Sequence, residues 1–330
     1  MSQIFDALLR SEAERGGEET AAEVEATELL RYVEREAATK LASATVLNGF
    51  EPAATGARQA VLEPVEDYSR AEVFELGRVP RNAPDEHRDI WSQFQKRSAT
   101  CSLEGRLVCY TDRATPTAEA FRLLSVRLRE LRQTRTLNKL LITSTVPREG
   151  KSTMAANLAC TLAQKKEEKV LLLEGDIRRP TLSKIFGLGG SVSGICQLLQ
   201  GDCALTDCIY QLEGTGIWIM PAGTTPATPL ELLQSKKLSP LMDQLAELFN
   251  WLIVDSPPVL PLADTSIWSQ MVDGILLVTR HGTTEKNQLK RGLQALEPSK
   301  VIGALLNGSQ ASTYSSYYYT SSADSKRAAG

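Results

Sequence analysis

Residues 140–159, which read LLITSTVPREGKSTMAANLA, constrain the fold of this 330-residue chain more than any other segment. The apolar run 140–144 predicts a buried strand, and the helix-forming residues 152–164 predict a helix. Between them lies a short loop that ends in Gly-Lys-Ser-Thr at positions 150–153. A strand that passes through a glycine-containing loop directly into a helix is typical of the α/β units of a parallel sheet.

The residue types of this loop predict that it binds phosphate. Gly150 lets backbone N–H groups approach phosphate oxygens, and the helix start adds unsatisfied donors and partial positive charge. Lys151 is expected to reach the β- and γ-phosphates of a nucleotide, and the Ser152 hydroxyl can ligate Mg²⁺. The strict pattern for such loops asks for glycine at position 145, where this chain has Thr145. The residues expected to line the nucleotide are Pro147, Arg148, Glu149, Gly150, Lys151, Ser152 and Thr153.

The region from 107 to 308 is predicted to be an α/β domain. Its short apolar runs alternate with amphipathic helices, which indicates a mostly parallel sheet flanked by helices, as in P-loop NTPases. The predicted strands are 139–144, 169–174, 218–221, 251–255, 274–279 and 301–307, and the predicted helices are 117–132, 152–164, 239–249 and 285–296.

Two of these strands end in acidic residues, Glu174 with Asp176 in one case and Asp255 in the other. Because ligands bind at the carboxyl ends of strands in an open parallel sheet, these carboxylates are expected to face the phosphate loop. Asp255 and Asp176 fit the surroundings of a Mg²⁺ ion, and Glu174 fits a base that accepts a proton from an incoming hydroxyl. All three also fit plain turn residues or helix caps. Arg178 and Arg179 fit either a phosphate contact or a solvated basic turn.

The two ends of the chain differ in composition from this central domain. Residues 1–106 are rich in Glu, Ala and Arg and are predicted to be a partly disordered regulatory arm with helices at 4–15 and 21–42. Residues 309–330 are predicted to be a disordered tail.

Composition argues against several other classes of protein. A net charge of −3 gives no electrostatic case for binding nucleic acid. No apolar run approaches the roughly 18 residues of a membrane-spanning helix, and the opening residues do not read as a secretory signal. The six cysteines form no C-x-x-C pair and only two histidines accompany them, so we expect reduced thiols, no zinc site and a cytoplasmic location.

A cluster of tyrosines distinguishes the predicted tail. Four of the eight tyrosines, Tyr314, Tyr317, Tyr318 and Tyr319, lie within six residues among Ser and Thr. A stacking or adhesive tail would account for such a cluster, and so would a set of phosphate acceptors. Each phosphate adds about −1.5 to −2 charge at neutral pH, so several would repel one another. The cluster therefore predicts a phosphorylation switch between an associated and a dispersed state.

Taken in order, these segments resemble the bacterial tyrosine autokinases, or BY-kinases, of capsule and exopolysaccharide biosynthesis. The resemblance covers about residues 110–320. It rests on ITSxxPxEGKST at 142–153, DIRRP at 176–180, FGL at 186–188, PAGTTPATPLELL at 221–233, DSPP at 255–258, DGILLV at 273–278, LNG at 306–308 and the tyrosine cluster.

The resemblance implies a transferase that uses ATP and Mg²⁺ to autophosphorylate its tyrosine tail, and so regulates polysaccharide polymerisation and export. The roles that it implies are catalysis by Lys151, Glu174, Asp176 and Asp255, metal binding by Ser152, Asp176 and Asp255, and an approach of Asn307 to the adenine. It divides the chain into an arm (1–106), a kinase domain (107–308) and an acceptor tail (309–330).

Three positions depart from the family pattern. They are Glu174, where the family usually has aspartate; Arg148, where it commonly has glycine; and Ser125, the third position of the E-x-x-R-x-x-R stretch that begins with Glu119 and Arg122. That stretch mediates ring assembly in the family, so a homo-oligomer stays an open expectation here.

The resemblance also implies partners. Members without a spanning segment act with a separate membrane co-polymerase, which activates them and recruits them to the inner face of the plasma membrane, and a cognate phosphotyrosine phosphatase opposes them. The apolar residues Ile4, Phe5, Leu8 and Leu9 of the predicted first helix either dock on such a partner or fold back on their own domain.

Two other functions fit the phosphate loop. One is a partitioning or positioning ATPase, a class that carries a second lysine early in the loop, where this chain has Val146. The other is a non-catalytic, nucleotide-gated interaction module whose tail only binds. Neither accounts for the tyrosine cluster as well as an autokinase does.

Overall fold

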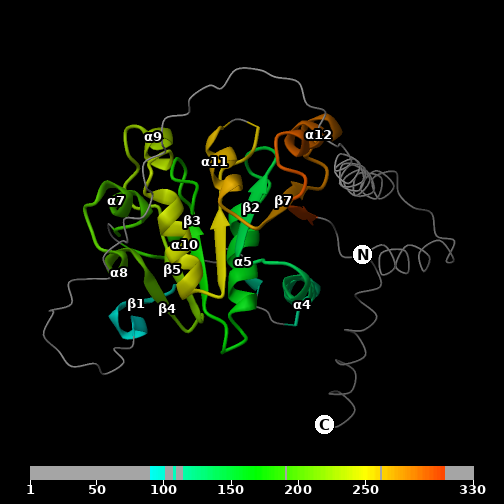
Figure 1. Ribbon diagram of the computed structural model, residues 1–330. Helices are drawn as coiled ribbons and strands as arrows, with labels where there is room; N and C mark the ends of the chain where they lie inside the picture. Colours follow the sequence, from blue (N-terminus) through cyan, green and yellow to red (C-terminus); the bar gives the residue numbers. More distant parts are fainter. Residues whose placement is uncertain (1–89, 101–106, 109–113, 190–191, 261, 309–330) are drawn as a thin grey trace, which may run out of the picture. The chain divides into compact units, whose positions relative to one another are not determined.

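The computed structural model describes residues 90–100, 107–108, 114–189, 192–260 and 262–308, all within one compact unit of the chain (Figure 1). The predicted N-terminal helices and the tyrosine cluster lie outside the described residues. Within them, eight strands form one sheet in the order β1-β4-β5-β3-β6-β2-β7-β8. The strands are β1 (Gln95–Ser98), β2 (Lys139–Ser144), β3 (Val170–Glu174), β4 (Tyr210–Glu213), β5 (Ile217–Met220), β6 (Trp251–Asp255), β7 (Gly274–Arg280) and β8 (Val301–Asn307).

The sheet is mostly parallel, as predicted. Each of the neighbouring pairs from β5 to β8 is parallel. Strand β4 is antiparallel to β5, and β1 pairs with β4 in the parallel sense. The carboxyl ends of β3, β6, β2, β7 and β8 therefore meet at one edge, the upper edge in Figure 1. The α/β fold class expected of a P-loop protein is confirmed.

Helices connect the strands and cover both faces of the sheet. They are η1 (Ile90–Gln93), α4 (Pro116–Thr134), α5 (Lys151–Leu162), α6 (Leu182–Ile185), α7 (Ile195–Gln200), α8 (Leu205–Cys208), α9 (Pro229–Leu233), α10 (Leu238–Leu248), α11 (Asp264–Gln270) and α12 (Lys286–Gln294). Among the described residues, no helix has both the length and the apolar character that crossing a membrane requires.

Alternation along the strands builds the core on each face. Val170 and Leu172 of β3 belong to the cluster that packs around α5, so the intervening Leu171 points to the opposite face. Helix α5 is buried at every position from Ala155 to Leu162, as expected of a helix covered by α4 on its outer side. Helix α10 instead buries one stripe at spacing i, i+3, i+4 and i+7, which is typical of a helix with one solvated face.

The sheet extends beyond the predicted domain at its β1 edge. The segment 90–100, which the sequence placed in the N-terminal arm, pairs with β4 through β1. Its aromatic rings pack beside those of the domain: Trp91 lies 5.1 Å from Trp218 and 5.4 Å from Phe249 between ring centroids. Lys169 Nζ lies 4.8 Å from the Trp91 ring, within cation–π range. The described fold therefore begins before residue 107.

Candidate functional site

The phosphate loop joins the end of β2 to the start of α5 and contains two residues in the left-handed region. Gly150 has φ 95°, and a Cβ at this position would clash with the side-chain amide of Asn307. Arg148 has φ 70°, a conformation that costs a non-glycine residue on the order of 1 kcal/mol. Glycine is thus favoured at 150, whereas Arg148 holds a strained backbone conformation.

Thr145 occupies the position where the strict pattern has glycine, and α12 accommodates it. Its side chain is fully buried and lies against Gly292, where an added Cβ would come within 3.0 Å of the Thr145 methyl carbon. A glycine on the facing helix therefore provides the space that the threonine takes. This compensation lies 147 positions away, so the loop pattern alone gave no sign of it.

The structure brings Lys151, Asp176 and Asp255 together at the carboxyl edge of the sheet. Strands β3 and β6 are neighbours in register, with Glu174 opposite Asp255. Lys151 Nζ lies 2.9 Å from Asp176 Oδ2 and 3.8 Å from Asp255 Oδ1. Burial lowers the pKa of Lys151, but the carboxylates of Asp255 and Asp176 outweigh it, so the pKa is raised and the side chain stays charged.

Asp255 is the least satisfied member of this group. It is fully buried, and within the described part of the chain neither carboxylate oxygen has a well-aligned hydrogen-bond partner. Burial raises its pKa to about 6, against the charge of Lys151 and the nearby Ser152 hydroxyl. The Asp255 carbonyl, by contrast, accepts the N–H groups of Gly175 and Asp176 at 2.8 and 2.9 Å.

An unpartnered buried carboxylate beside a serine hydroxyl fits a Mg²⁺ site. Mg²⁺ prefers oxygen ligands and usually combines one or two carboxylates with water and substrate phosphates. The described residues contain no cluster of three or more His, Cys, Asp or Glu that would hold a metal unaided. Asp255, Ser152 and Asp176 would therefore hold the ion jointly with nucleotide oxygens.

Glu174, the residue predicted to act as a base, is enclosed by backbone donors. It is fully buried, and its carboxylate accepts backbone N–H groups from Thr181, from Leu182 at 2.6 Å and from Ala222 at 3.0 Å. Burial raises its pKa to about 7, although the backbone donors act in the other direction. With these three donors, Glu174 fastens two loops to the end of β3. Its role as a base stays a prediction.

Helix α11 supports the loop that follows β3. Arg178 forms a two-pronged ion pair with Asp264, with N–O distances of 2.7 and 3.0 Å. The indole N–H of Trp268 donates to the Gly175 carbonyl at 3.1 Å. Arg179 is exposed, and its backbone N–H donates to Asp176 Oδ1 at 3.1 Å. The loop that carries Asp176 is thus held from two sides.

The remaining loop residues divide between structural contacts and exposure. Asn307 Nδ2 donates to the Glu149 carbonyl at 2.8 Å, so this amide contacts the loop backbone, and its approach to an adenine stays a prediction. The Glu149 side chain is fully buried and accepts the Thr284 hydroxyl, a contact the sequence did not predict. Pro147 and Arg148 are exposed, and Ser152 and Thr153 are half-buried at the helix start.

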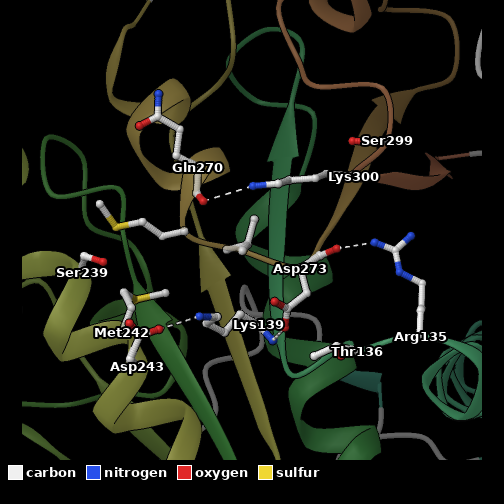
Figure 2. A pocket seen from close by; sticks show the side chains of 12 residues that line it. Arg135, Thr136, Lys139, Ser239, Met242, Asp243, Gln270, Asp273, Ser299 and Lys300 are labelled. Carbon is white, nitrogen blue, oxygen red and sulfur yellow. Dashed lines mark hydrogen bonds and ion pairs between the residues drawn. The ribbon is translucent and has the colours of Figure 1, made fainter. Parts of the chain in front are cut away.

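A cavity of about 750 Å³ lies at the opposite edge of the sheet, near the start of β2 (Figure 2). Its charged groups already have partners: Lys139 with Asp243 at 2.8 Å, Arg135 with the Asp273 carbonyl at 2.6 Å, and Lys300 with the Gln270 carbonyl at 3.0 Å. Each of these three cationic side chains therefore has a hydrogen-bond partner within the protein.

The E-x-x-R-x-x-S stretch lies on α4. Arg122 forms an ion pair with Glu119 one turn earlier, and the Ser125 hydroxyl donates to the Arg122 carbonyl at 2.7 Å. On the same helix Leu123 and Val126 are 53% and 48% exposed, which is unusual for large apolar residues in this structure. The helix therefore presents an apolar strip next to the stretch.

Comparison with known proteins identifies the family. No family model matches the chain. It is 32% identical over 224 residues to the tyrosine-protein kinase YwqD of Bacillus subtilis strain 168, an alignment that covers 67% of this chain and 94% of YwqD. It is 32% identical over 195 residues to the tyrosine-protein kinase CpsD of Streptococcus agalactiae, covering 58% of this chain and 85% of CpsD.

Solved structures agree with the sequence comparison. The kinase domain of the Escherichia coli tyrosine kinase ETK superposes with a TM-score of 0.58 at 29% identity, covering 63% of this chain and 84% of that domain. The chimerical protein CapA2B2 superposes with a TM-score of 0.59 at 28% identity, covering 68% of this chain and 99% of the chimera. Since the match to YwqD extends over nearly all of that kinase, the chain belongs to the bacterial tyrosine-protein kinases.

Proposed function

We propose that this kinase transfers the γ-phosphoryl group of ATP to the tyrosines of its own tail, Tyr314, Tyr317, Tyr318 and Tyr319. The observation that carries the proposal is the group formed by Lys151, Asp176 and the unpartnered Asp255 at the end of the phosphate loop. Neither alternative from the sequence is favoured, since the relatives matched over most of their length are tyrosine-protein kinases.

The chemistry follows from the charges at this edge. The phenolic oxygen of a tyrosine forms the new bond to the γ-phosphorus, the bond from that phosphorus to the β–γ bridging oxygen breaks, and ADP leaves. Lys151 and the N–H groups at the start of α5 offset the negative charge on the transferred group. A bound Mg²⁺ ion would neutralise phosphate charge, and Asp255, Ser152 and Asp176 would hold it.

The tyrosine proton needs an acceptor, because the phenol has an ordinary pKa near 10. With Glu174 committed to backbone donors, Asp176 is the remaining carboxylate at the edge that is not fully enclosed, being 5% exposed. We assign the proton to Asp176. Its Oδ2 atom lies 2.9 Å from Lys151 Nζ, beside the group that would face the γ-phosphate.

The arrangement of the chain and its partners is part of the proposal. Residues 107–308, extended by the strand segment 90–100, would form the kinase domain, with a regulatory arm before it and the acceptor tail 309–330 after it. A membrane co-polymerase of a polysaccharide export system would recruit and activate the kinase at the inner face of the plasma membrane, and a cognate phosphatase would reset it. Family membership and the tyrosine cluster support this arrangement.

Self-association through α4 belongs to the same proposal. Ser125 replaces a charged residue of the family stretch, but the neighbouring Leu123 and Val126 are exposed and apolar. They would offer contact area that does not depend on the missing charge.

Intact-mass spectrometry after incubation with ATP and Mg²⁺ tests the proposed activity. Wild-type protein should gain stepwise phosphates that map to the four tail tyrosines, while Lys151→Ala gains none. Lys165→Ala is the matched control, since this lysine lies just beyond the same helix with a side chain that is 52% exposed. Phosphotyrosine on the Lys151→Ala protein would refute the site. Nucleotide binding without phosphorylation, even with the membrane partner added, would favour the nucleotide-gated module.

A further inference from the structure

We infer that Thr284 and Glu149 form a clamp that positions the phosphate loop for the nucleotide, with Thr284 as a positioning residue. The inference rests on the proposed nucleotide site and deepens it. Thr284 lies in the turn between β7 and α12, more than 130 positions from the loop, and it carries none of the phosphate-binding chemistry itself.

The Glu149 carboxylate forms one hydrogen bond within the phosphate loop and one to the β7–α12 turn. One of its oxygens accepts the Val146 N–H at 2.9 Å, three residues back along the loop. The other accepts the hydroxyl of Thr284. Both contacts are made by a side chain with no exposed surface. The carboxylate therefore ties the start of the loop to its end and ties both to the β7–α12 turn.

Further contacts fix the clamp on the side of the turn. The Thr284 oxygen accepts the backbone N–H of Arg280 at 2.9 Å, which holds the hydroxyl toward Glu149. The Arg280 guanidinium donates to the Arg148 carbonyl at 3.3 Å, and Asn307 donates to the Glu149 carbonyl at 2.8 Å. The left-handed backbone at Arg148 is thus flanked by contacts from β7 and β8, which explains how the loop keeps a strained shape.

Two physical effects make this clamp favour nucleotide binding. A loop whose backbone is already held in one conformation loses less conformational freedom when phosphate binds, so more of the contact energy appears as affinity. The clamp also holds a negative side chain away from the phosphates. Without the Thr284 hydroxyl, the Glu149 carboxylate would lose one of its two donors, and its movement into the loop would repel an anionic ligand.

The test compares Thr284→Val, which removes the hydroxyl at constant shape, with Thr284→Ser, which keeps it. Titration calorimetry with a non-hydrolysable ATP analogue and Mg²⁺ should show binding about tenfold weaker for the valine variant, the factor that corresponds to about 1.4 kcal/mol. The serine variant should stay within about threefold of wild type. Thr283→Val is the matched control: this exposed neighbour has no side-chain role in the clamp, and its affinity should not change.

A second measurement separates positioning from general destabilisation. Hydrogen exchange of the nucleotide-free protein should show faster exchange at the Val146 amide in Thr284→Val, with core amides of β2 and β6 unchanged. If the valine variant does not fold, Thr284→Ala carries the same expectations. Wild-type affinity for the analogue in Thr284→Val, or faster exchange spread evenly over the core, would overturn the clamp. Failure of wild-type protein to bind the analogue would instead overturn the proposed nucleotide site.

Discussion

Replacing Asp255 with asparagine should stabilise the metal-free protein while it abolishes phosphorylation. The side chain is fully buried, and the nearest cation, Lys151 Nζ, lies 3.8 Å from its Oδ1 atom. Burying a charge without hydrogen-bond partners costs free energy, and asparagine keeps the shape without the charge. The carboxylate that is proposed to hold the metal therefore destabilises the metal-free protein.

The size of the effect follows from the pKa of Asp255, which burial raises from 3.8 to about 6. Because the folded-state pKa lies above the unfolded one, the stability that this carboxyl contributes is complete below about pH 3.8 and is lost as the pH rises through about 6. At 1.36 kcal/mol per pKa unit, the loss at neutral pH is at most about 3 kcal/mol. We expect Asp255→Asn to raise the free energy of unfolding by about 1–3 kcal/mol. The gain can fall short of the maximum because the substitution also removes the attraction between Asp255 and Lys151.

Urea unfolding in the presence of EDTA measures the effect. At pH 7.5 the variant should have the larger free energy of unfolding, and the difference should shrink as the pH falls from about 6 toward 4. Added Mg²⁺ and ATP should stabilise wild type but not the variant. Asp243→Asn is the control, because that side chain is 65% exposed and should change stability by no more than about 0.5 kcal/mol. A variant less stable than wild type at pH 7.5, or a difference independent of pH, would refute the reasoning.

Three further substitutions test separate parts of the argument. Arg148→Gly should raise the free energy of unfolding by about 0.5–1 kcal/mol in urea titration, since it removes left-handed strain and keeps the backbone carbonyl that Arg280 contacts; a loss would show that the greater freedom of a glycine in the unfolded chain outweighs the strain. Glu174→Asp, one methylene shorter, should cost about 1–3 kcal/mol by the same assay because it cannot reach all three backbone donors, whereas faster autophosphorylation would support its role as a base. Burial raises the pKa of Glu168, but Arg129 outweighs this effect and the net pKa is lowered. The stability that this carboxylate contributes is therefore lost as the pH falls below its unfolded value of 4.5. In thermal melts, the melting temperature of Glu168→Gln should fall less in acid than that of wild type.

The central strands could be predicted because burial on both faces leaves an unbroken apolar run. Strands β2 and β6 begin and end at the predicted residues, and each carries a run of buried apolar side chains. Strand β1 could not be found in this way, since its four residues, QKRS, are all exposed and lack an apolar alternation. What places β1 in the sheet is pairing with β4 and the packing of Trp91 and Phe94 beside it.

At the site, the sequence predicted where the acidic residues lie but not how their side chains are oriented. Sequence patterns placed Glu174, Asp176 and Asp255 at the right edge, because a parallel sheet fixes where strands end. They could not show where each carboxylate points. That depends on backbone N–H groups at Thr181 and Ala222, which other segments of the chain supply. Thr284 gave no signal, since a threonine in a polar turn is ordinary.

The differing satisfaction of the three carboxylates orders their roles. Glu174 accepts three N–H groups, Asp176 pairs with Lys151 and the Arg179 N–H, and Asp255 has no well-aligned partner within the described residues. A side chain with all its acceptor sites filled can hold a loop but has little left to offer a ligand. An unfilled buried carboxylate is costly to the fold alone and gains most from a cation. Along this edge, the number of hydrogen bonds that a carboxylate already accepts, rather than its residue type, separates the residue that holds loops from the one proposed to bind the metal.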